Sequence, residues 1–134
     1  MRRFAVIARP LLGLVFIVFG LNGFFQFMPA PPPSGLWGAF TDVLFRSHYV
    51  MFVSGVQVVS GILLLTNQYA PLALVTLAAV LANILVFHVT MMPAGLPAAL
   101  IVTLLWVIVA LPMREHFAPL FARTAHVPEH QDPA

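Results

Sequence analysis

The sequence predicts an all-α integral membrane protein, a bundle of four transmembrane helices. Of its 134 residues, 61% are hydrophobic and only 7% are charged, whereas a soluble domain carries about 25% charged residues. Six basic and four acidic residues cannot cover the surface of a water-soluble globule of this size. Intrinsic disorder is excluded by the same composition, because disordered chains have low hydrophobicity. Lipid is therefore the expected solvent for most of the side chains.

Four apolar runs each approach the length of about 20 helical residues that crosses a bilayer core of about 30 Å. None alternates polar and apolar residues as the strands of a membrane barrel do, and a helix satisfies every backbone group in lipid. Pro71 and Pro97 stand where helices start, a position that needs no N–H partner. The predicted membrane domain, residues 1–113, contains spans at residues 4–28, 49–66, 71–92 and 96–113.

Small residues on three spans predict close helix packing, and Ala78 and Ala82 form such a pair on the third span. Gly13 and Gly20 are two turns apart on the first span, as are Ser54 and Gly61 on the second. Such residues allow the backbones of transmembrane helices to approach each other.

The positions of the arginines predict the orientation of the bundle. Arg46 is the single basic residue on the side away from the termini, and the other five arginines lie on the side of the termini. By the positive-inside rule both termini are expected in the cytoplasm. Nucleic-acid binding is not expected, because the arginines form no continuous basic patch.

The segments outside the spans divide into an outward loop and a tail. Three consecutive prolines at 31–33 favour an extended chain. Residues 35–46 then gather apolar side chains on one helical face, which predicts a short helix lying in the membrane interface. The tail, residues 114–134, is expected to be cytoplasmic, amphipathic in its first part and disordered beyond Thr124.

Polar side chains within the spans are the candidates for function, because each is costly in lipid unless it is paired. Counting residues from the outward ends of the spans puts four of them at a depth of about 9–13 Å, one on each helix. A further glutamine and the single histidine within a span lie nearer the outward surface. The predicted layer consists of Asn22, Gln57, Asn83 and Thr103, with Gln26 and His88 above it.

Two interpretations of this layer stay open. Amides and hydroxyls commonly join transmembrane helices, and each such hydrogen bond contributes only about 0.6 kcal/mol on average. Alternatively, the layer lines a small polar cavity that opens outward and binds a lipid head group or a redox ring. The one-sided placement favours the cavity, because hydrogen bonds that only join helices could be distributed through the whole depth.

Several kinds of chemistry have no residues to support them in this chain. The absence of cysteine excludes disulfides, thiolate nucleophiles and Fe–S clusters within it. The spans contain no Asp or Glu, which argues against a carboxylate proton relay. A haem held by His48 and His88 would need a demanding geometry, and His126 and His130 stand in a tail expected to be solvated. Neither haem nor a metal ion is therefore expected.

Four stretches of the sequence resemble, in order, the helices of the DoxX family of small bacterial membrane proteins. These are RPLLGL with FGLNGFF at 9–25, QVVSG with LLL at 57–65, NILVFH at 83–88 and PAGLP at 93–97. The resemblance implies a four-helix protein of the bacterial inner membrane, and the family name is associated with subunits of thiosulfate:quinone oxidoreductase. Relatives often carry Glu at the position of Gln57 and His at the position of Gln26. An amide retains the hydrogen bond but carries no proton or charge.

The predicted function is that of a non-catalytic accessory subunit of a larger membrane complex linked to redox chemistry or quinones. The alternative is a module that binds a quinone or a lipid head group in the outward-facing cavity. The expected partners are the lipid bilayer and other membrane-protein subunits, and the sequence is also compatible with a homo-oligomer. Transport of a solute is disfavoured, because four helices without intramembrane charge line a pore poorly.

Overall fold

A computed structural model describes residues 2–124, which form helices and turns and no strand. Four stretches are long and apolar enough to cross a membrane, so the predicted four-helix architecture is confirmed and a multi-pass membrane protein is indicated. The α-helices are α1 (Arg2–Phe25), α2 (Gly35–Arg46), α3 (Tyr49–Thr66), α4 (Ala70–Thr90), α5 (Leu96–Ala110) and α6 (Arg114–Phe117). Short 3₁₀ turns follow at Pro93–Gly95, Leu111–Met113 and Ala118–Phe121.

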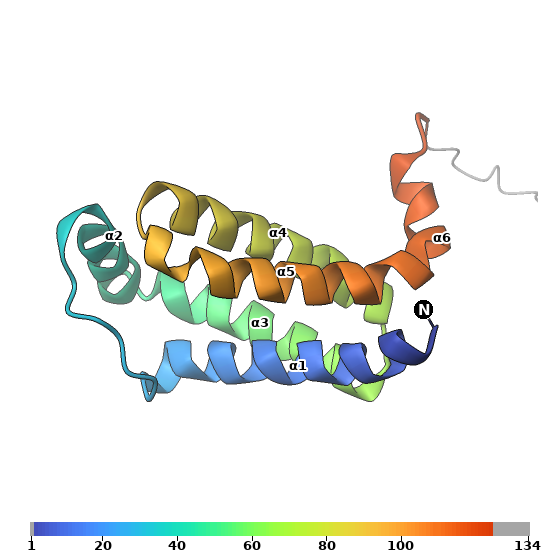
Figure 1. The fold of residues 1–134 in the computed structure, drawn as a ribbon, viewed down its shortest axis with the longest axis horizontal. Helices are drawn as coiled ribbons and strands as arrows, with labels where there is room; N and C mark the ends of the chain where they lie inside the picture. The colour runs from blue at the N-terminus through green and yellow to red at the C-terminus, as the bar shows by residue number, and fades with distance from the viewer. Residues whose placement is uncertain (1, 125–134) are drawn as a thin grey trace, which may run out of the picture.

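The helices α1, α3, α4 and α5 run side by side and form the bundle (Figure 1). The start of α1, the turn between α3 and α4 and the end of α5 share one end of the bundle, which we call the terminal end. The helix α2 lies at the opposite end, which we call the α2 end. The bundle therefore has the antiparallel topology that short connections between spans require.

The half of the bundle nearest the terminal end is filled by apolar side chains. Leu12, Leu64, Leu74 and Leu77 are fully buried there. Two hydrogen bonds between helices belong to the same half: Arg9 Nη1 donates to the Leu64 carbonyl at 3.0 Å, and Trp106 Nε1 donates to the Leu74 carbonyl at 3.0 Å. The arginine thus adds a second donor to a carbonyl in the last turn of α3, which also accepts from the backbone N–H of Asn67 at 3.3 Å.

The close packing expected at small residues occurs between α1 and α3, whose backbones approach each other. A Cβ atom on Gly13 would stand 2.7 Å from the carbonyl oxygen of Gly61, and one on Gly61 would stand 2.6 Å from that of Gly13. A Cβ on Gly20 would meet the Ser54 carbonyl oxygen at 2.8 Å. Because these neighbours are backbone atoms, a larger residue would push the helices apart.

The segment 35–46 is helical as expected, and α2 packs against the α2 end of the bundle. Gly38 is buried against Pro33, so the proline stretch supports the start of the helix. The rings of Phe40 and Phe87 lie 5.7 Å apart between centroids, which joins α2 to α4. Its placement in a membrane interface stays a prediction.

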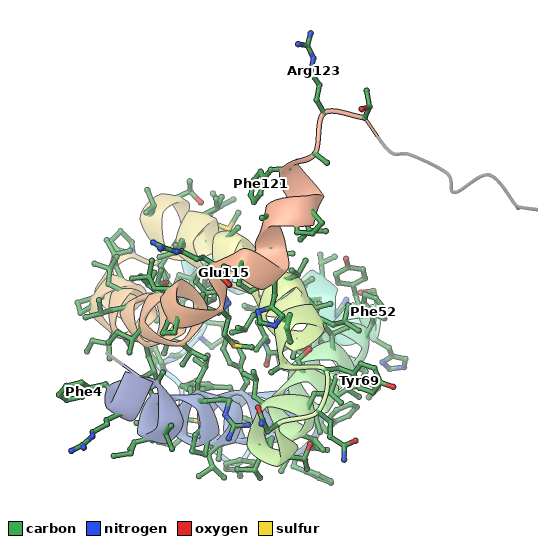
Figure 2. All side chains as sticks on the ribbon, turned by 90° about the vertical axis from the view of Figure 1, so that its right-hand side faces the viewer. Phe4, Phe52, Tyr69, Glu115, Phe121 and Arg123 are labelled. Atoms are coloured by element: carbon green, nitrogen blue, oxygen red, sulfur yellow. The ribbon has the colours of Figure 1, made fainter. Side chains whose placement is uncertain are left out.

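The chain after α5 turns away from the bundle axis (Figure 1). Seen from the terminal end, Phe121 and Arg123 lie on this projecting segment, while Phe4 points outward from α1 (Figure 2). The predicted disorder beyond Thr124, together with His126 and His130, falls outside the described residues.

Candidate functional site

A cavity of about 320 Å³ lies between α1, α3, α4 and α5 in the half of the bundle nearest the α2 end. Its volume is at the lower end of the range of about 300–1,000 Å³ that small-molecule sites occupy. Most of its wall is apolar, and three phenylalanines contribute to it, Phe16, Phe19 and Phe45. Its polar residues are Asn22, Ser54, Gln57 and His88.

Three of the six predicted site residues therefore meet at this cavity. Asn22 comes from α1, Gln57 from α3 and His88 from α4. Ser54 joins them and was expected only as a packing residue. Its position one turn before Gln57 on the same helix was a signal that both side chains share a face.

Asn22 stands in the last turn of α1 and lines the cavity. The backbone N–H of Met28 donates to Asn22 Oδ1 at 2.7 Å, and that of Gln26 donates to the Asn22 carbonyl at 2.8 Å. Because an N–H group only donates, the side-chain oxygen is fixed as the acceptor of this bond. The Nδ2 group of Asn22 is thus left as a donor for the cavity.

His88 is held by the hairpin between α4 and α5. Its Nδ1 lies 3.1 Å from the carbonyl oxygen of Met92, and a carbonyl oxygen only accepts. A neutral His88 therefore carries its proton on Nδ1, which leaves Nε2 with a lone pair. A Cβ on Gly95 would overlap the imidazole ring, so the glycine provides the space that the ring occupies.

Gln57 makes no side-chain hydrogen bond within residues 2–124, although it is half-buried. Across the same residues, no buried side-chain nitrogen or oxygen lacks a partner. The unpaired polar atoms of Asn22, Gln57 and His88 are consequently accessible rather than sealed in protein. They can all hydrogen-bond to a molecule in the cavity.

The cavity is closed at one end by buried side chains, and some of its other lining residues are exposed. Phe16 and Leu81, both nearly fully buried, close it towards the terminal end. Phe19 on α1 and Ala98 on α5 line the cavity and are also exposed on the outside of the bundle. Phe45 of α2 is a third lining residue that is exposed on the outside. Phe45 of α2 covers the α2 end of the cavity.

The other three predicted residues do not line the cavity. Gln26 lies beyond the end of α1 in the left-handed region, with a φ of 48°, and is exposed. Asn83 is exposed on α4, where its Nδ2 donates to the Ala79 carbonyl at 2.9 Å. The Thr103 hydroxyl donates to the Ala99 carbonyl at 2.8 Å within α5. None of these three residues joins Asn22, Gln57 and His88 in the lining of the cavity.

Comparisons with protein-family models, curated proteins and solved structures found no match to this chain. Within residues 2–124, no three histidine, aspartate or glutamate side chains lie close enough together to hold a metal ion. The chemistry of the site therefore has to be inferred from hydrogen bonding and shape.

Proposed function

We propose that this protein binds the head of an amphipathic small molecule, a quinone-type ring or a lipid head group, in the cavity between its helices. One observation carries the proposal. Asn22, Gln57 and His88 come from three helices and present accessible hydrogen-bonding atoms to one largely apolar cavity. Small-molecule sites usually have a small number of polar groups on a largely apolar wall.

The hydrogen bonds between helices argue against a purely structural role for these three residues. Side chains that join helices bond across the interface, as Ser60 of α3 and Thr76 of α4 do at 2.9 Å. That pair and the bonds of Arg9 and Trp106 hold the helices together. By contrast, Asn22 and His88 bond only to backbone a few residues along their own chain segment.

The exposure of the lining residues Phe19 of α1 and Ala98 of α5 on the outside of the bundle supports entry from the bilayer. In a membrane the outward faces of both helices contact acyl chains, so a lipid-soluble molecule would reach the cavity without crossing water. Its ring would occupy the cavity while its tail stayed among the lipids. By the arginine distribution, we place both termini in the cytoplasm and the cavity in the outer half of a bacterial inner membrane.

The resemblance to the DoxX family extends the proposal to a partner complex. A chain that binds a redox ring but has no redox centre of its own would serve as a non-catalytic accessory subunit, holding the ring for another subunit. Purification in mild detergent followed by mass spectrometry tests this role. Stoichiometric membrane partners are expected, and a lone monodisperse species would contradict it.

Ligand binding is tested by native mass spectrometry of the purified protein and its variants. Gln57→Leu is the most informative substitution, because it removes an amide that makes no hydrogen bond in the fold. We expect Gln57→Leu and Asn22→Leu to lose the co-purifying ligand. Asn83→Leu and Thr103→Val, on the same helical bundle but off the cavity, are the matched controls and should retain it. Unchanged ligand in all four variants would contradict the proposal.

A further inference from the structure

We propose that the cavity selects a neutral aromatic ring carrying a hydroxyl group, the phenol or hydroquinone class, over a phosphate head group and over the oxidised quinone. The inference rests on the proposed function and narrows its ligand. Three features of the cavity carry it: the charge of its wall, the proton position on His88 and the aromatic side chains around it.

The wall of the cavity contains no charged side chain among the described residues. Two arginines of the bundle and α2 are engaged elsewhere: Arg46 pairs with Asp42 at 3.2 Å on the exposed face of α2, and Arg9 donates to Leu64 at the terminal end. Moving a phosphate out of water without a cation to pair with it is very costly. A phospholipid head group is therefore a poor occupant, and a neutral ring is a good one.

The proton on His88 decides which neutral ring fits. With Nδ1–H donating to Met92, the accessible Nε2 is an acceptor. A ring hydroxyl donates to this lone pair. The oxidised quinone presents only carbonyl oxygens, which can accept from amide groups but cannot donate to Nε2. The lone pair of His88 then stays without a partner, and an unmade hydrogen bond in a desolvated site weakens binding. The opposite tautomer of His88, with its proton on Nε2, would lose the hydrogen bond to the Met92 carbonyl.

The amides complete the recognition of a hydroxyl. After donating to His88, a ring hydroxyl retains lone pairs, and the amide groups of Gln57 and Asn22 are donors on the neighbouring walls. One hydroxyl therefore satisfies groups of both kinds. Phe16, Phe19 and Phe45 supply aromatic faces for the ring itself.

The test measures the binding of four probes to the full chain in nanodiscs by titration calorimetry. The hydroquinones are titrated under reducing, anaerobic conditions. The probes are a decyl-substituted hydroquinone, the matching quinone, a short hydroquinone without tail, and inorganic phosphate. We expect the decyl hydroquinone to bind about tenfold more tightly than the quinone, the ratio for one hydrogen bond of about 1.4 kcal/mol. The short hydroquinone should still bind if the cavity recognises the ring, and phosphate should not bind.

Variants separate this inference from the proposed function. His88→Phe should reduce the hydroquinone affinity to that of the quinone. Gly95→Ala should have the same effect, because the new methyl group displaces the imidazole of a histidine that is still present. Asn83→Leu is the control and should change neither affinity. Equal binding of hydroquinone and quinone to the unmodified chain would overturn the selectivity and leave the proposed function standing. Binding of phosphate in the cavity would overturn the charge argument. If no ring compound binds at all, the quinone-type ligand of the proposed function is excluded as well.

Discussion

The Nδ1 atom of His88 lies 3.1 Å from the carbonyl oxygen of Met92, four residues further along the chain. This bond joins the last turn of α4 to the hairpin before α5, and it determines which nitrogen of the ring is left to the cavity. A local backbone contact thus sets the hydrogen-bonding character of a site formed by several helices.

The first prediction concerns this proton directly. In protein labelled with ¹⁵N-histidine, the neutral ring of His88 should show a protonated Nδ1 and an unprotonated Nε2, because the Met92 carbonyl can only accept. The resonances are assigned by difference from the His88→Gln variant and read from solid-state or solution NMR. A ring protonated on Nε2 alone would contradict the assignment.

A second prediction concerns Gly95, whose missing side chain makes room for the imidazole. In Gly95→Ala the new methyl group would overlap the ring, so the ring or the hairpin has to move. The His88 resonances should shift, while the unfolding free energy should fall by about 1–3 kcal/mol, as for other overpacked sites. Gly35→Ala does not serve as a control because of its positive φ of 58°. Gly55→Ala is the control, because a Cβ atom on Gly55 would have none of the neighbouring side chains or helices of the described residues within 4 Å.

A third prediction compares two glycines of α3. Gly61→Ala places a methyl group 2.6 Å from the Gly13 carbonyl oxygen and should destabilise the bundle by about 1–3 kcal/mol. Gly55→Ala meets nothing and should be neutral or stabilise the helix by up to about 1 kcal/mol. Unfolding in mixed micelles measures both. Equal effects of the two substitutions would contradict the close approach of α1 and α3.

A fourth prediction concerns the hydrogen bond between Ser60 and Thr76. Ser60→Ala should cost only about 0.6 kcal/mol, because the Thr76 hydroxyl keeps the Ala73 carbonyl at 2.9 Å as a partner. Thr90→Val, which removes a bond within α4 alone, is the comparison and should have a smaller effect. A loss of several kcal/mol in Ser60→Ala would indicate a role that the structure does not explain.

A fifth prediction concerns orientation and uses the absence of native cysteine. Ser34→Cys replaces an exposed side chain at the α2 end that makes no cap bond, and Ala122→Cys replaces an exposed one beyond the terminal end. A membrane-impermeant maleimide should label the first in intact cells and the second only after lysis. The reverse pattern would overturn the arginine-based topology.

The number of spans and their approximate length were predictable because both depend on composition and run length. The position of a residue along its span could also be counted from the ends of the span. The direction in which a side chain points could not be predicted. Asn83 satisfies its amide on its own helix and faces away from the cavity, and spans that are apolar on all sides give no periodic signal for the inward face. Gln26 was misplaced relative to Asn22 because α1 ends at Phe25.

Photoaffinity mapping of a bound ring tests the central claim most directly. An azido-substituted hydroquinone is cross-linked to the protein in nanodiscs, and the modified residues are identified by peptide mass spectrometry with unlabelled hydroquinone as competitor. We predict competed adducts on the cavity walls, at 15–23 of α1, 50–57 of α3 and 84–88 of α4. Adducts confined to the outward face of α4 around Asn83, or adducts that the competitor leaves unchanged, would contradict a ligand site between the helices.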